Sequence, residues 1–153
     1  MILVRHARAG NKANWDRDDE LRPLTERGVI QAVSLVRSLA DDDVSVVWSS
    51  PSVRCRQTVE PLAAARGVTV QDQALLAKDA RVEALLAWLL ANSTAPWAVC
   101  THGEVVRALL DAGRSTGLID APARVTEKGA AWRVKPRPDA GAELQYLPPL
   151  LLR

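Results

Sequence analysis

Ile2-Leu3-Val4-Arg5-His6 follows Met1 directly, and this stretch decides the fold that the sequence predicts. Its three apolar residues have no helical period, which is typical of a short strand buried on both faces. Other short apolar runs at residues 44–48, 68–70 and 97–100 predict three further strands. Because segments of helical character separate most of these runs, the pattern indicates an α/β protein with a largely parallel sheet.

Two helices are expected in the first half of the chain. Thr25 is expected to cap the first, which runs to about Leu39. The predicted apolar face of this helix comprises Ile30, Val33, Leu35, Val36 and Leu39. The second helix opens at Pro51 or Ser52, and we expect Pro61 to kink or interrupt it.

Later in the chain, residues 81–90 and 104–112 predict helices, and residues 130–134 and 144–147 predict strands. The sequence contains neither a repeat nor a shift in composition that would mark a domain boundary. We therefore expect a single domain over residues 1–153, with three α/β/α layers around a central, mostly parallel sheet.

Composition argues against several classes of function. The 153 residues are 48% hydrophobic and carry a net charge of +2, with scattered arginines. Because nucleic-acid-binding proteins usually show a basic stripe or cluster, we expect no nucleic-acid partner. No apolar run approaches the length of a signal peptide or a membrane span, and the two cysteines suggest no disulfide framework. The sequence predicts a reduced, cytoplasmic protein without a metal, cofactor or membrane partner, and makes no prediction of oligomeric state.

The two histidines of the chain both lie at the ends of predicted strands. His6 follows the first apolar run, and His102 follows the run at 97–100. Ligands of open α/β sheets bind in the crevice outside the carboxyl ends of the strands. We therefore expect the two strands to bring both imidazoles to one crevice.

Two arginines accompany these histidines. Arg5 precedes His6, and Arg54 follows the turn after the second predicted strand. A guanidinium carries a fixed fork of donors that suits phosphate oxygens and stays charged at physiological pH. Two such groups can bind an anion and offset the charge that develops on the equatorial oxygens during phosphoryl transfer.

The order of these motifs resembles the histidine phosphatase superfamily, whose fold is that of the phosphoglycerate mutases. The resemblance covers essentially the whole chain and rests on Leu3-Val4-Arg5-His6-Ala7, Arg22-Pro23-Leu24-Thr25-Glu26-Arg27-Gly28, Ser50-Pro51-Ser52-Val53-Arg54-Cys55-Arg56-Gln57-Thr58 and Thr101-His102-Gly103. Within the superfamily the chain is similar to the small SixA-like branch, in which Ala often follows the first histidine. Residues 5–13 and the segment Lys128-Gly129-x-x-Trp132 are also similar to the histidine phosphatase domain that is fused to some Nudix hydrolases.

This resemblance implies a role for each residue of the motifs. His6 would attack phosphorus in its neutral form and become a phosphohistidine. Arg5 and Arg54 would hold the phosphoryl oxygens, and His102 would donate a hydrogen bond to them. Arg22 would be a third phosphate contact or an anchor of the loop that precedes it.

A proton donor for the leaving group is harder to assign. Mutase-like members carry a glutamate after the third strand, but residues 75–79 contain none. The polar segment 7–23 predicts a long loop, and long loops in compact proteins are often functional. Within it we take Asp19 as the first candidate for the acid and Asp18 as the second. Weaker candidates after the third strand are Asp79 and Glu83.

The sequence therefore predicts a metal-independent phosphatase that acts through a phosphohistidine intermediate on His6. The expected substrate is a phosphomonoester of a small molecule or a protein phosphohistidine. Similarity to the Nudix-linked domain adds a nucleotide or dinucleoside polyphosphate as an alternative, and with it the question of a separate Nudix partner. A catalytically silent phosphate-binding module is a further alternative from another functional class.

Overall fold

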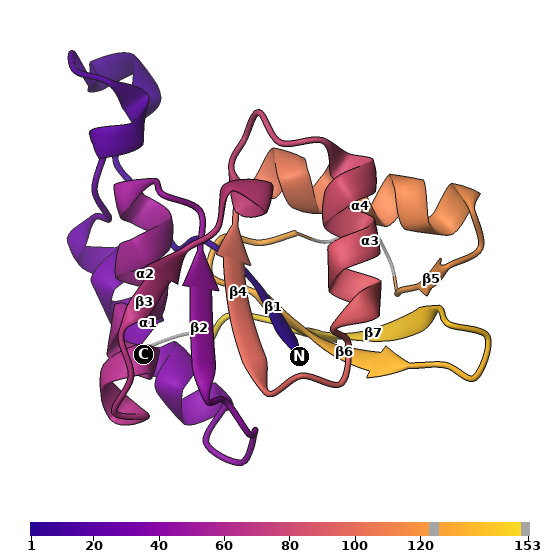
Figure 1. Ribbon diagram of the computed structural model, residues 1–153. Helices are drawn as coiled ribbons and strands as arrows, with labels where there is room; N and C mark the ends of the chain where they lie inside the picture. Colours follow the sequence, from indigo (N-terminus) through magenta and orange to yellow (C-terminus); the bar gives the residue numbers. More distant parts are fainter. Residues whose placement is uncertain (123–125, 151–153) are drawn as a thin grey trace.

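The computed structural model describes residues 1–122 and 126–150, and their central feature is a seven-stranded sheet (Figure 1). The strands lie in the order β3-β2-β4-β1-β6-β7-β5. Only β6 runs antiparallel to its neighbours in the described sheet, so the prediction of a mostly parallel sheet is confirmed. The strand bounds are β1 Ile2–Arg5, β2 Val46–Ser49, β3 Val70–Asp72, β4 Trp97–Thr101, β5 Ile119–Asp120, β6 Ala131–Pro136 and β7 Ala142–Leu147.

Within residues 1–122 and 126–150, four α-helices cover the two faces of the sheet (Figure 1). One apolar cluster joins α1 (Glu26–Ser38) and α2 (Val53–Ala65) to one face, and another joins α3 (Val82–Ala91) and α4 (Gly103–Ser115) to the other. In β1, Leu3 belongs to the second cluster while its two neighbours belong to the first. This alternation is the two-residue period of a strand buried on both faces, and it confirms the three-layer prediction.

The buried face of α1 differs from the predicted one. Ile30 and Val33 are exposed, whereas Gly28, Ala32 and Leu35 are buried. The cause is a close approach at Gly28, where a Cβ atom would lie 2.0 Å from the carbonyl oxygen of Arg8. The face of the helix that carries Gly28 and Ala32 therefore packs against the segment after β1. Ile30 and Val33 lie on another face and point to solvent.

Of the two outcomes predicted at Pro61, a kink or an interruption of the second helix, the interruption does not occur. Residues Val53–Ala65 form one α-helix that includes Pro61. The proline ring removes one N–H donor from the helix. Burial of Val59 and Leu62, both in the apolar core, offsets that loss because most helical stability in proteins comes from tertiary packing.

Several strands also begin or end at residues other than those expected. β2 begins two residues later than expected, and β3 covers Val70–Asp72 instead of residues 68–70. The sequence analysis missed β5, a two-residue strand that is too short to show a period. In the described part of the chain, no helix is both long and apolar enough to cross a membrane.

The predicted loop over residues 7–23 contains two short 3-10 helices, η1 (Lys12–Asn14) and η2 (Asp19–Leu21). It projects above the edge of the sheet toward which β2 and β4 point (Figure 1). The indole N–H of Trp15 donates to the carbonyl oxygen of Asp18 at 2.9 Å, which braces η2 from inside the loop. The loop therefore carries charged side chains to the carboxyl ends of the strands.

Candidate active site

β1 and β4 are neighbouring parallel strands, and they deliver the two histidines to one place. The amide of His6 donates to the carbonyl oxygen of Thr101 at 3.0 Å, which fixes the end of one strand against the other. The imidazole centroids lie 5.7 Å apart in an edge-to-face arrangement. Both rings are buried, with relative exposures of 7% for His6 and 1% for His102. The expected juxtaposition of the two histidines is therefore present in the structure.

Hydrogen bonding gives His6 a defined tautomer. Its Nδ1 lies 2.8 Å from the carbonyl oxygen of Ala7, and a carbonyl oxygen can only accept. Nδ1 must therefore carry the proton, which leaves the lone pair on Nε2. A neutral imidazole with a free Nε2 is the form of histidine that can act as a nucleophile.

The surroundings of His6 also keep it neutral. Burial lowers the pKa of His6 to about 3, and the positive charges of Arg54 and Arg5 and the neighbouring His102 act in the same direction. The contact with Ala7 opposes this effect but is outweighed. His6 is thus unprotonated throughout the physiological pH range.

Arg54 enters the site from the first turn of α2 and is almost fully buried. Its Nη1 donates to the carbonyl oxygen of Asp19 at 2.8 Å, and its Nη2 donates to the carboxylate of the same residue at 3.0 Å. Nη2 also lies 3.3 Å from Nδ1 of His102. The guanidinium therefore connects the loop to the second histidine.

Arg5 lies against the beginning of α4. A Cβ atom on Gly103 would lie 2.5 Å from Cζ of Arg5, so only glycine leaves room for this guanidinium. Nη1 of Arg5 donates to the carbonyl oxygen of Thr126 in the segment before β6. Helix α4 begins at Gly103, directly after His102, so its N-terminal dipole favours an anion beside the two arginines.

Both arginines hold an unused donor. Among the described residues, Nε of Arg5 and Nε of Arg54 are buried without a hydrogen-bond partner. Burying a charged donor without a partner is costly. Oxyanions such as phosphate accept hydrogen bonds from guanidinium groups at several oxygens. The unused donors are consistent with an anion site at this edge of the sheet.

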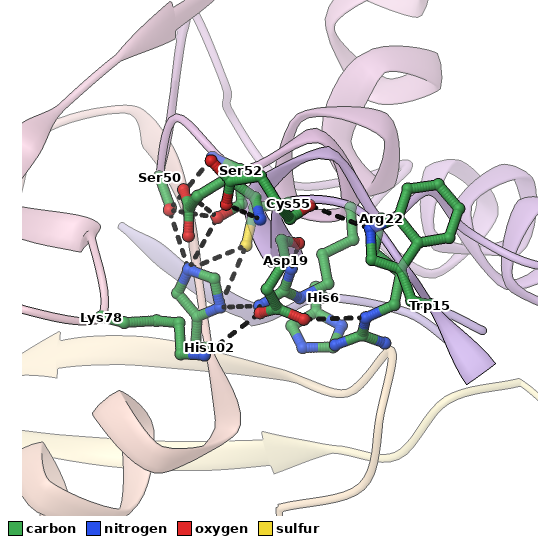
Figure 2. A network of polar contacts seen from close by, with 12 residues as sticks. His6, Trp15, Asp19, Arg22, Ser50, Ser52, Cys55, Lys78 and His102 are labelled. Atoms are coloured by element: carbon green, nitrogen blue, oxygen red, sulfur yellow. Dashed lines mark hydrogen bonds and ion pairs between the residues drawn. The ribbon is translucent and has the colours of Figure 1, made fainter. Parts of the chain in front are cut away.

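Asp19, the first candidate for the acid, lies at the site, but its carboxylate is paired with three cations, of which Arg22 and Lys78 are labelled in Figure 2. Its carboxylate pairs with Arg22 at 3.0 Å, Arg54 at 3.0 Å and Lys78 at 3.2 Å. Partial burial raises the pKa of Asp19, but the hydrogen bonds from Arg22 and Lys78 and the charge of Arg54 outweigh burial and lower it. Asp19 is held as a carboxylate, which opposes a role as proton donor.

The other candidate acids are not brought into this cluster. Asp18 is exposed and accepts from the amide of Glu20 as the N-cap of η2. Asp79 is exposed in the turn before α3, and Glu83 is exposed in the first turn of α3. Arg22 reaches back to the carbonyl oxygen of Gly10, so its contacts in the structure are those of a loop anchor.

Several contributors were missed at the level of sequence. The hydroxyl of Thr58 accepts from the amide of Ala7 at 2.9 Å, and the side chain of Gln57 accepts from the amide of Leu24 at 2.9 Å. These two contacts tie α2 to the segments around the site. Both residues were quoted in the motif without a role, and their adjacency to Arg54 was the available signal. Lys78 gave no such signal, because its partner Asp19 is 59 residues away.

No group of three or more histidine, cysteine, aspartate or glutamate side chains able to hold a metal ion occurs in residues 1–122 and 126–150. The two cysteines are buried and free, and Sγ of Cys55 lies 3.6 Å from Nε2 of His102. The charged or titratable groups around the two imidazoles therefore include two guanidinium groups, a paired carboxylate and a buried thiol.

Comparison with known proteins assigns the class of protein. The model of the histidine phosphatase superfamily, branch 1, matches residues 1–78. The chain belongs to this superfamily, as the motifs around His6 and Arg54 predicted. A curated relative, the 8-oxo-(d)GTP phosphatase of Mycolicibacterium smegmatis, is 30% identical over 137 residues. That match includes 86% of this chain but only 42% of the relative, so the chain spans less than half of that protein.

Solved structures show the same fold. The protein histidine phosphatase SixA complexed with tungstate matches with a TM-score of 0.75 at 19% identity, over 94% of this chain and 92% of that one. A SixA-type protein from Nakamurella multipartitia matches with a TM-score of 0.69 at 26% identity, over 98% and 96% of the two chains. The similarity therefore extends over nearly the whole length of these small proteins.

Proposed function

We propose that this protein is a phosphatase that transfers a phosphoryl group first to Nε2 of His6 and then to water. The observation that carries the proposal is the fixed tautomer of His6, whose Nδ1 is engaged by Ala7. This contact leaves the Nε2 lone pair free beside Arg5, Arg54 and His102. Such an arrangement of a nucleophile and cationic donors suits phosphoryl transfer, in which catalysis is mostly positioning and charge stabilisation.

The reaction has two balanced steps. In the first, Nε2 of His6 forms a bond to phosphorus while the bond to the leaving group breaks, and that electron pair departs with the leaving atom. In the second, a water oxygen binds phosphorus as the N–P bond breaks, and the pair returns to Nε2. One proton of the water passes to solvent, the other stays on the new oxygen of inorganic phosphate, and the phosphate leaves the site. Arg5 and Arg54 stabilise the oxygens in both transition states.

The leaving group is expected to depart with little help from a protein acid. Asp19, the candidate donor, is paired with cations, and its pKa is lowered despite the opposing effect of burial. Substrates with good leaving groups therefore suit the site best. We propose a protein phosphohistidine or an activated phosphomonoester as the first class of substrate. The relative from Mycolicibacterium smegmatis favours a nucleotide as the second class.

The nucleophile is tested with His6→Ala, which removes the only proposed acceptor of the phosphoryl group. We expect a loss of at least about 10³-fold in kcat on 4-nitrophenyl phosphate in the presence of EDTA. Wild-type protein should also retain ³²P on His6 after rapid denaturation at alkaline pH. Wild-type activity in the variant would refute the assignment, and a wild type that traps no label and turns over no substrate would indicate a silent phosphate-binding module.

The substrate class is tested with one panel measured on wild type and His6→Ala together. The panel contains a phosphohistidine protein, nucleoside di- and triphosphates, and an alkyl phosphate. Turnover of the phosphohistidine protein at higher kcat/KM than the nucleotides would support the first class. The reverse order would support the second.

A further inference from the structure

A chain of buried hydroxyl groups connects the second histidine to a carboxylate. Nε2 of His102 lies 2.8 Å from Oγ of Ser50 and 3.4 Å from Oγ of Ser52. The two serine hydroxyls are 3.5 Å apart, and Oγ of Ser52 donates to Oε2 of Glu20 at 2.7 Å. Both serines are fully buried, and Figure 2 shows them beside the imidazole.

The carboxylate fixes the direction of every hydrogen bond in this chain. An ionised Glu20 can only accept, so the single hydroxyl proton of Ser52 points to it. Ser52 then accepts from Ser50 or directly from His102. The hydroxyl of Ser50, whose proton points toward Ser52, in turn accepts from Nε2–H of His102. The negative charge thus selects a proton on the side of the ring that faces the serines.

The opposite side of the ring agrees with this assignment. Nδ1 of His102 lies 3.3 Å from Nη2 of Arg54, and a guanidinium can only donate. Nδ1 therefore accepts, and Nε2 carries the proton. His6 has the opposite tautomer, with its proton on Nδ1. The site holds two imidazoles whose protons are placed by different partners.

We propose that Glu20 is a positioning residue that orients His102 through Ser52 and Ser50 and stabilises its protonated form when a phosphoryl group is bound. This proposal rests on the proposed function, because it assigns His102 the task of donating to the phosphoryl oxygens. A phosphoryl dianion would draw Arg54 toward its own oxygens and favour a proton on Nδ1 of His102. Glu20 would then balance the imidazolium charge across the two serines.

Other charged or titratable groups also act on His102, and the test must separate Glu20 from them. The groups that face the ring or its immediate partners are His6 directly after β1, Asp19 of η2, Arg54 and Cys55 of α2, Lys78 before α3, Cys100 of β4 and Glu104 of α4. Each of these stays unchanged in the variants below. Any difference between variants therefore reports the chain that begins at Glu20.

The first experiment measures the two imidazoles by ¹⁵N NMR in untagged protein, which has only two histidines. The wild type should show one ring with its proton on Nε2 and one with its proton on Nδ1. Glu20→Gln removes the carboxylate that fixes the direction of these hydrogen bonds. The Gln amide can also donate to Ser52, so the preference for Nε2–H should weaken.

Ser52→Ala breaks the chain and leaves the carboxylate in place, so it should weaken the Nε2–H preference as well. Glu20→Asp keeps the negative charge on a shorter side chain, so it should weaken the Nε2–H preference less than Glu20→Gln does. The matched control is Asp16→Asn, which removes an exposed carboxylate from the same loop and should leave both rings unchanged. An unchanged His102 in both Glu20→Gln and Ser52→Ala would overturn the proposal.

Kinetics supply the second readout. If Glu20 orients the proton that His102 donates in the transition state, breaking the chain should lower kcat more than it changes KM. Glu20→Gln should therefore reduce kcat at pH 7.5 by roughly tenfold with little change in KM, and Glu20→Asp should restore part of that loss. An unchanged kcat in Glu20→Gln, or a rise in KM alone, would overturn the proposal. Failure of the proposed function would appear separately, as a wild type without phosphohistidine at His6.

Discussion

At the scale of a single residue, the glycine at position 103 determines where the charged guanidinium of Arg5 can lie. Its missing side chain lets the guanidinium of Arg5 lie against the first turn of α4. His102 directly precedes this turn as the N-cap of α4, so the absence of a side chain at Gly103 lets Arg5 lie close to the residue after His102. The Arg5 guanidinium is constrained further by its contact with Thr126.

Gly103→Ala should therefore weaken phosphate binding without unfolding the protein. The added methyl group would displace the Arg5 guanidinium, and we expect kcat/KM on 4-nitrophenyl phosphate to fall by roughly 10- to 100-fold. Gly10→Ala is the matched control, because no atom lies within 4 Å of a Cβ at Gly10. Equal activity of the two alanine variants would contradict the steric role of Gly103.

At the scale of elements, ion pairs of η2 attach the long loop of residues 7–23 to the edge of the sheet at which β1 and β4 end. Asp19 binds Arg54 of α2 and Lys78 before α3, while Arg22 ties the end of η2 back to Gly10. These ion pairs are partly buried, where they are screened less than exposed pairs. These ion pairs hold the long loop next to both imidazoles.

The variant Asp19→Asn tests whether Asp19 anchors the loop or acts as a general acid. A general acid assists poor leaving groups far more than good ones. If Asp19 is only an anchor, kcat on an alkyl phosphate and on 4-nitrophenyl phosphate should fall by a similar factor of about 3 to 10. A loss on the alkyl phosphate that exceeds the loss on the aryl phosphate by 100-fold would restore Asp19 as the proton donor.

At the scale of the whole molecule, the burial of neutral His6 makes the free energy of unfolding depend on pH. Burial lowers the pKa of His6 to about 3 in the folded protein, whereas the unfolded chain binds the proton near its ordinary value of ~6.5. The unfolded state therefore holds more protons below that value. The free energy of unfolding should fall as pH decreases from about 6.5 toward 3, and this contribution should be complete above about 7.

This coupling is measured by urea unfolding at pH 7, 5.5 and 4 for wild type and His6→Gln. His6 alone should contribute a decrease of at most ~1.4 kcal/mol per pH unit within the window. The variant keeps the carboxylates that also titrate there, so the difference between the two proteins isolates the imidazole. Parallel curves for both proteins would show that His6 is not held neutral by the fold.

Much of this architecture was predictable because it depends on local signals. Apolar runs gave the buried strands, and the rule that parallel strands end at one edge brought His6 and His102 together. The serine chain to Glu20 was not predictable, since it joins residues whose sequence separation carries no period. The face of α1 was mispredicted because hydrophobicity alone does not report the close approach at Gly28. Contacts of this kind depend on packing between distant segments.

The central position of β1 has a consequence for synthesis of the protein. This first strand pairs with β4 and β6, so its neighbours are complete only after residue 136. A growing chain therefore carries His6 without these two neighbouring strands until residues 97–136 have been added. Long-range pairing of this kind slows folding because a long loop must close before contacts form. We therefore expect His6 to reach its buried surroundings only after β4 and β6 have both been synthesised.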